Sequence, residues 1–187
     1  MSNLFQAWQA GRTVRKHTML VRYRETVAEH TWGVVMLLLK YVPRPSLQLI
    51  KAAVVHDMGE QATCDIPAHL CWQHPALKEM VQIKEDEHVA AVMAYPQPAE
   101  DHAVSLTHDE ELALEVADRA EFIVSCWYEH NMGNTFMRET IARTIPKVAE
   151  SLGAMSESSQ LRGAMQSLFT DLLRLTQTEA ARQAVPA

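Results

Sequence analysis

Apolar residues recur every three to four positions along most of this chain, with polar residues between them. This spacing matches the 3.6-residue turn of an α-helix, and we find no convincing run of the strict alternation typical of a half-buried strand. Prolines, glycines and capping residues divide the pattern into segments. It predicts helices over residues 3–10, 26–41, 46–60, 76–94, 109–130, 135–152 and 157–180. We therefore expect an all-α protein that forms one domain over residues 1–187.

Several local signals sharpen these boundaries. Thr26 is followed three residues later by Glu29, which is the spacing of a capping box at a helix start. Residues 63–74 contain Pro67, are followed by Pro75, and are expected to form a loop. Pro146 should kink or break the helix over residues 135–152, because proline lacks the backbone N–H that a helix interior needs.

The last expected helix carries apolar residues in a narrow 4-3-4-3 spacing, at Leu161, Met165, Leu168, Leu172 and Leu175. Such a seam is typical of helix pairing, either between two copies of a chain or within one domain. Both alternatives remain open from the sequence. We expect a homo-oligomer, either a dimer or a hexamer.

Composition and charge narrow the function classes. The 187 residues are 48% hydrophobic and 21% charged, which suits a helical globular domain. The net charge of −6 argues against binding a nucleic acid polymer, which needs a broad basic face. The longest apolar run, residues 34–39, is too short to span a membrane. Three cysteines without a CxxC spacing signal no disulfide framework, so we expect a cytoplasmic protein.

One segment departs from the acidic average. Residues 11–24 contain no acid but five cations, at Arg12, Arg15, Lys16, Arg22 and Arg24. Guanidinium and ammonium groups donate hydrogen bonds to phosphate, so the cluster indicates either an anion site or a solvated basic face.

Two of the nine histidines stand out from the isolated ones. His30 lies near the start of one expected helix, and His56 lies with Asp57 near the end of the next. A short connection favours antiparallel neighbours, so His30 should face the His56-Asp57 pair. Two imidazoles and a carboxylate suit a divalent metal ion. Glu60, four residues after His56, should share its helical face and act on a metal-bound water.

The segments AEHTWGV, VVHDMGE, TCDIP and VADRAE occur in this order between residues 28 and 121. Together they resemble the HD-domain phosphohydrolases, specifically bacterial 5′-deoxynucleotidases and phage dATP triphosphohydrolases. The resemblance covers roughly residues 8–130. It implies an HD-domain helical bundle, here followed by additional C-terminal helices.

The resemblance also implies roles for individual residues. It makes His30, His56, Asp57 and Asp118 the ligands of one divalent ion, with Mn, Co, Zn and Mg as candidates. It places Glu60 and Asp65 near the attacking water and the scissile phosphate, as catalytic residues. Arg15 stands fifteen positions before His30, where the family has a phosphate-binding arginine.

This chain departs from the family pattern at three positions. Lys16 replaces a tryptophan, Cys64 replaces the glycine of a TGD motif, and Cys71 replaces a lysine. Substrate contacts are therefore assigned to residues near these departures and near Arg15. They are Arg15, Lys16, Thr18, Met19, Trp72 and Lys78.

The resemblance implies hydrolysis of a 2′-deoxynucleotide. A triphosphate carries more negative charge and needs more cations, so the cationic segment favours a dATP-type triphosphohydrolase that releases deoxynucleoside and tripolyphosphate. The alternative is a 5′-deoxyribonucleotidase that acts on monophosphates. Two other classes are weaker: a non-catalytic helical adaptor, and a di-metal oxygenase that would use Glu85-x-x-His88, of which only one copy is present where two are needed.

Overall fold

The computed structural model describes residues 3–94 and 105–183. Over this part of the chain the fold is all-α, as predicted, and the sole extended pairing is an isolated bridge between Val14 and Thr26. The chain divides into two compact units. Unit 1 comprises Met1–Trp32 and Lys51–Val104, and unit 2 comprises Gly33–Ile50 and Ser105–Ala187.

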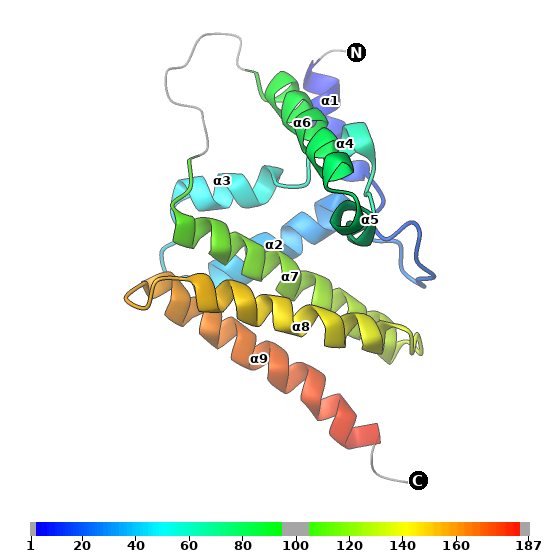
Figure 1. The fold of residues 1–187 in the computed structure, drawn as a ribbon, viewed down its shortest axis with the longest axis vertical. Coiled ribbons are helices and arrows are strands. Elements are labelled where there is room, and N and C mark those ends of the chain that lie inside the picture. The colour runs from blue at the N-terminus through cyan, green and yellow to red at the C-terminus, as the bar shows by residue number, and fades with distance from the viewer. Residues whose placement is uncertain (1–2, 95–104, 184–187) are drawn as a thin grey trace. The chain divides into compact units, whose positions relative to one another are not determined.

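The elements follow one another along the chain as Figure 1 labels them. They are α1 (Asn3–Gln9), the 3-10 turn η1 (Ala10–Arg12), α2 (Val27–Tyr41), α3 (Leu47–Val55), α4 (Glu60–Thr63), α5 (Ala68–Gln73), α6 (Pro75–Val92), α7 (His108–Asn131), α8 (Met137–Ala154) and α9 (Gln160–Gln183). The division between the units falls within α2 and within α3.

In unit 2, helices α7, α8 and α9 pack side by side (Figure 1). The buried face of α7 is built mainly from small residues, including Ala113, Ala117 and Ala120, which allow close approach of a neighbouring helix. A polar contact joins α7 to α8, because Arg119 donates hydrogen bonds to the Lys147 carbonyl and to the Ser151 hydroxyl.

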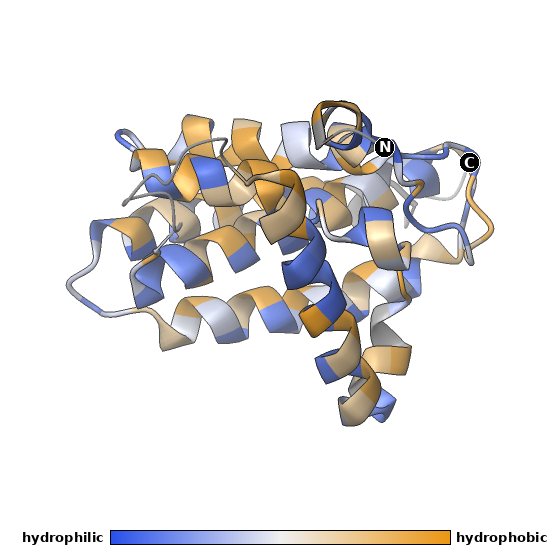
Figure 2. Cartoon of the chain, turned by 90° about the horizontal axis from the view of Figure 1, so that it is seen from above, coloured by the Kyte–Doolittle hydropathy of each residue, from blue (hydrophilic) through white to orange (hydrophobic). Residues whose placement is uncertain are grey.

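The apolar seam of the last helix is used within the chain. Met165, Leu168 and Leu172 are buried, and α9 packs against α7 and α8. The hydrophobic and hydrophilic residues of the long helices are coloured in Figure 2. Packing onto its own domain, one of the two alternatives for this seam, is therefore what unit 2 displays. The oligomeric state stays a prediction.

In unit 1, helix α6 packs against α1, α4 and α5. A small apolar cluster joins η1, the turn after α3 and the end of α6, through Ala10, Met58 and Val92. Gly59 sits where the chain passes closest to α6: a Cβ on it would lie 2.4 Å from Glu85 Cβ. A side chain at position 59 would clash with Glu85. The absence of a Cβ at Gly59 therefore allows α6 to approach the segment that carries His56 and Asp57.

The third helix is shorter than predicted. It ends at Val55, and residues 56–59 form a series of turns before α4 begins at Glu60. The bond from Glu60 N–H to the Asp57 carbonyl, 3.1 Å long, spans three residues, as in a turn. The expectation that His56 and Glu60 share one helical face is thus wrong, because the helix does not continue between them.

Two further expectations need correction. The expected loop over residues 63–74 contains helix α5, which starts directly after Pro67, whose fixed φ suits the residue before a helix. Helix α8 runs without a break through Pro146, so the expected break is wrong, whereas the kink stays a prediction. Proline removes one hydrogen bond, whereas buried residues on both sides of it, such as Ile141 and Val148, hold the helix against its neighbours.

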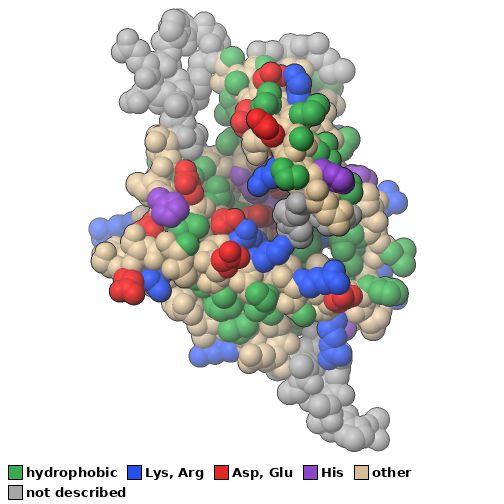
Figure 3. Space-filling view, viewed as in Figure 1, with side chains coloured by type: hydrophobic (Ala, Val, Ile, Leu, Met, Phe, Trp, Pro, Cys, Tyr) green, Lys and Arg blue, Asp and Glu red, His purple; other side chains and the backbone are tan. Residues whose placement is uncertain are grey.

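None of the helices in the described ranges is long and apolar enough to cross a membrane. On the face seen in Figure 3, acidic, basic and apolar side chains are interspersed.

The role of Gly59 can be tested by substitution. In Gly59→Ala the new methyl group meets Glu85, so we expect the free energy of unfolding to fall by about 1–3 kcal/mol, the usual cost of overpacking. Gly163→Ala is the matched control, because no atom lies within 4 Å of a Cβ built there. That helix-interior change should instead stabilise by about 0.5–1 kcal/mol. Equal unfolding midpoints in denaturant would contradict the assignment.

Candidate metal centre

His30 is held at the start of α2 by the capping box predicted around Thr26. The Thr26 N–H donates to Glu29 Oε2 at 2.8 Å, and the Glu29 N–H donates to Thr26 Oγ1 at 3.4 Å. The cap starts the helix one residue later, at Val27, and places His30 in its first turn. The His30 side chain is fully buried. A buried imidazole needs polar partners, and His56 and Asp57, in the turn after α3, are two of them.

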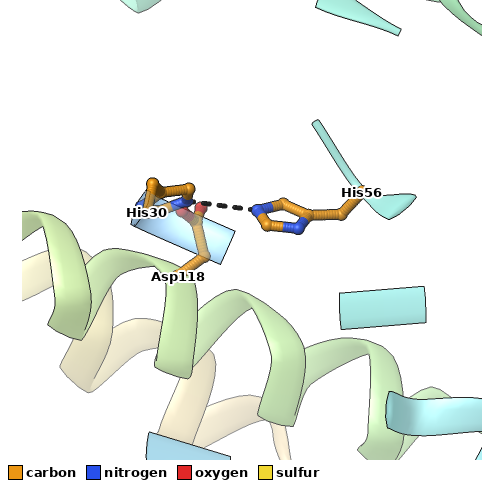
Figure 4. Close-up of side chains that lie close together, drawn as sticks. All are labelled: His30, His56 and Asp118. Carbon is orange, nitrogen blue, oxygen red and sulfur yellow. Dashed lines mark hydrogen bonds between the residues drawn. The ribbon is translucent and has the colours of Figure 1, made fainter. Parts of the chain in front are cut away.

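His56 Nδ1 lies 2.8 Å from the Ala53 carbonyl oxygen. A carbonyl only accepts, so Nδ1 carries the proton and Nε2 keeps its lone pair. That Nε2 atom lies 3.2 Å from His30 Nε2 (Figure 4). The backbone of α3 therefore sets the tautomer in which His56 offers a nitrogen to a metal ion, as metal-binding histidines do.

Asp57 completes a group of three within unit 1. Its Oδ2 lies 3.4 Å from His30 Nε2, and its Oδ1 lies 3.4 Å from His56 Nε2. Ligand atoms about a tetrahedral ion with bonds of about 2.0–2.1 Å are roughly 3.3 Å apart. The two Nε2 atoms therefore stand at ligand separation, each 3.4 Å from a different oxygen of the Asp57 carboxylate, and nitrogen and oxygen donors suit zinc and its neighbours.

The fourth expected ligand, Asp118, lies on α7 in unit 2 (Figure 4). Its role as a ligand rests on the resemblance and stays a prediction.

Arg15 lies directly beside this group. Its Nη1 donates to Asp57 Oδ2 at 2.6 Å, and its side chain is 12% exposed. The guanidinium balances part of the carboxylate charge and sits where a phosphate oxygen beside the ion would find a donor. The residue that the resemblance assigned to phosphate is thus brought to the centre.

Glu60 has an unusual electrostatic environment. Burial, followed by repulsion from Asp57, raises its pKa from 4.5 to about 8, although Arg15 opposes the shift. Its Oε2 has no hydrogen-bond partner among the described residues. Glu85, whose own pKa is raised by burial, adds to the repulsion. Glu60 is consequently a carboxyl group able to gain or lose a proton near neutral pH.

Asp65 directly follows a residue with a strained backbone. Cys64 adopts φ 63° and ψ 168°, a combination that glycine tolerates far better than a residue with a Cβ. The cysteine that replaces the family glycine thus keeps the glycine conformation. Asp65 Oδ2 accepts a hydrogen bond from the Lys16 N–H and lies 4.0 Å from His17 Nδ1.

The remaining expected substrate contacts are distributed unevenly. Lys16 is buried, with its Nζ 2.8 Å from Glu25 Oε2, so its ammonium is engaged by that carboxylate. Thr18 and Lys78 are exposed, and Met19 is half-buried. Trp72 lies in α5. The guanidinium of Arg12 stacks over the Trp8 ring, 4.3 Å from its centroid.

Three contributors were missed by reading the sequence. The Ala53 carbonyl, which accepts from His56 Nδ1, is a backbone group, so the residue types of the sequence give no sign of it. The Lys16–Glu25 pair joins residues nine apart in a segment with no helical period. Glu85 was noticed only for its spacing to His88, whereas its Oε1 accepts from Thr63 at 2.6 Å and His88 Nε2 lies 3.0 Å from Gln61 Oε1.

Comparison with known proteins bears on the family and the fold. A family model described as "HD domain" matches residues 10–126, well over half of the chain. No curated protein sequence is similar enough to count as a relative. Among solved structures, the fold is similar to that of the cyanophage S-2L HD phosphohydrolase DatZ, bound to dA and one catalytic Zn²⁺ ion. The TM-score is 0.70 at 17% identity, over 93% of this chain and 98% of that one.

The pKa of Glu60 predicts a pH-dependent stability of the metal-free protein. The folded state holds this proton more tightly than the unfolded chain, so its contribution to stability is complete below pH 4.5 and lost as pH rises toward about 8. Glu60→Gln should remove that dependence, which is on the order of 2 kcal/mol after allowance for partial solvation. Denaturant titrations in chelator across pH 5–8 measure it. Glu157→Gln, at an exposed position, should retain the wild-type slope, and an unchanged slope in Glu60→Gln contradicts the assignment.

Proposed function

The chain belongs to the HD-domain family, and on that premise we propose that it is a metal-dependent phosphohydrolase acting on 2′-deoxynucleotides. Proteins of this family use divalent metal ions. The proposed ligands are His30, His56, Asp57 and Asp118. The observation that carries the proposal is the cluster in unit 1, where two imidazole nitrogens and a carboxylate stand at ligand separations with Arg15 bonded to the same carboxylate.

The chemistry follows from the neighbours of this cluster. A bound divalent ion would lower the pKa of a water molecule and polarise a phosphoryl oxygen. Glu60 would accept the proton that this water loses, and its raised pKa, which makes it a stronger base than an ordinary carboxylate, supports that role. Arg15 donates to the non-bridging oxygens of the phosphate. The water oxygen bonds to phosphorus, the bond from phosphorus to the 5′ oxygen breaks, and the 5′ oxygen takes up a proton from Glu60 or from solvent, so that the nucleoside leaves as an alcohol.

We favour a deoxynucleoside triphosphate of the dATP type as substrate, releasing deoxynucleoside and tripolyphosphate. Support comes from the similarity to DatZ, which was solved with dA and zinc. The same similarity favours zinc over Mn, Co or Mg.

A 5′-deoxyribonucleotidase is the second candidate, and one observation favours it. The surplus of cations argued for a triphosphate, yet the Lys16 ammonium is buried against Glu25 and unavailable to it. A monophosphate needs fewer donors than a triphosphate, so Arg15 and the metal ion would suffice.

The deciding experiment is a substrate panel. The purified protein is incubated with dNMPs, dNTPs and rNTPs in Zn²⁺, Mn²⁺, Co²⁺ or Mg²⁺, and phosphate and tripolyphosphate are separated. Tripolyphosphate from dATP supports the first candidate, and phosphate from dNMPs supports the second. Absence of hydrolysis throughout, together with a protein that purifies without stoichiometric metal, would favour the non-catalytic adaptor.

The metal centre itself predicts a clear loss of function. His56→Ala or Asp57→Ala should abolish hydrolysis and reduce bound metal, because each removes a ligand atom, while helical circular dichroism stays close to that of the wild type. His108→Ala is the control, since that histidine is exposed at the start of α7. It should retain full turnover. Undiminished hydrolysis in either ligand variant with metal supplied would refute the site.

A further inference from the structure

Lys16 is in an unusual position for a lysine. It is buried, and it adopts φ 55°, the left-handed region that favours glycine. Cys64 is the other residue with a side chain that has positive φ in the part of the chain described here. A strained backbone persists only where surrounding contacts fix it. Those contacts identify what Lys16 does.

Three contacts hold the residue. Its N–H donates to Asp65 Oδ2 at 2.5 Å, its carbonyl accepts from the Met19 N–H at 2.9 Å, and its Nζ lies 2.8 Å from Glu25 Oε2. The two side chains of the ion pair are 5% and 7% exposed. The ammonium is therefore withdrawn from the solvent from which a phosphate would arrive.

Arg15 is fixed by the same partner. Its N–H donates to the Glu25 carbonyl at 2.8 Å, while its guanidinium bonds to Asp57. The bridge between Val14 and Thr26 continues this pairing. Glu25 thus holds Arg15 through its backbone and Lys16 through its carboxylate, and the left-handed turn at Lys16 follows directly on the arginine.

We propose that Lys16 and Glu25 form a buried positioning pair that sets Arg15 against the metal centre, and that Lys16 does not itself contact phosphate. A buried ion pair adds little net stability, but separating its two charges is costly. Conformations of the turn that would separate Lys16 from Glu25 are therefore strongly disfavoured. The inference rests on the proposed function, in which Arg15 binds phosphate. It reassigns a residue that the cationic segment had suggested as a direct ligand.

The two roles predict effects of opposite sign at Glu25. If Lys16 contacts phosphate, Glu25→Gln frees the ammonium and leaves phosphate affinity equal or higher. If the pair positions Arg15, phosphate affinity falls by about fivefold or more in both Glu25→Gln and Lys16→Met. The probe is inorganic phosphate, and its Kd is measured by calorimetry on the metal-loaded full chain.

A second arm places each substitution in an Arg15→Ala background. A pair that acts through Arg15 causes no further loss there, whereas a direct contact by Lys16 still costs affinity in Lys16→Met/Arg15→Ala. Bound metal is quantified in every variant, because a structural collapse would lower it and a shift of Arg15 would not. Lys84→Met and Glu87→Gln are matched controls: they break an exposed pair with a 2.7 Å contact on α6 of the same unit. Both should bind phosphate as the wild type does.

If either single variant fails to fold, Lys16→Met/Glu25→Gln keeps the test decisive, since it removes both buried charges together. Weakened phosphate binding in that folded variant, with no further loss when Arg15→Ala is added to it, supports the positioning role, and wild-type affinity overturns it. Tighter binding in Glu25→Gln, or an additional loss in the Arg15→Ala background, also overturns it. Unchanged binding in Arg15→Ala alone refutes instead the phosphate-binding role of Arg15 in the proposed function.

Discussion

The carboxylate of Asp57 is the point on which the arrangement of the candidate centre depends. It lies 3.4 Å from each of two imidazole nitrogens and accepts from Arg15 at 2.6 Å. One negative charge therefore serves both the proposed metal site and the proposed phosphate site. Burial raises the pKa of Glu60, and the Asp57 charge adds to that rise, so that this carboxyl can exchange a proton near neutral pH. Burying these groups together is possible only because their charges partly cancel.

Backbone conformation does as much as side-chain chemistry to bring these groups together. Helix α3 ends at Val55, and His56 and Asp57 lie in the turns that follow. In these turns both side chains lie within 3.4 Å of the His30 imidazole. Gly59 then lets α6 come close enough for Glu85 to add to the field at Glu60. The left-handed residues Lys16 and Cys64 flank a single bond, from the Lys16 N–H to Asp65, which ties the two strained segments together.

This arrangement bears on the choice of substrate. A net charge of −6 leaves few cations to spare, and one of those beside Arg15 is already neutralised by Glu25. Electrostatic stabilisation of a phosphate must then come chiefly from the metal ion and Arg15. Three phosphoryl groups would call for further cations. Lys78, which is exposed in unit 1, is the additional lysine that the sequence suggested for this role.

The sequence by itself determined the all-α class and the capped start of α2, because helical periodicity and capping are local properties. It placed His30 toward His56 correctly, since a short connection limits how two helices can lie. It extended α3 too far and missed α5, because helix ends depend on hydrogen bonds that single residues do not reveal. The tautomer of His56, the burial of Lys16 and the approach of Glu85 were decided only by the tertiary structure: each depends on a backbone or side-chain partner distant in sequence or silent in residue type.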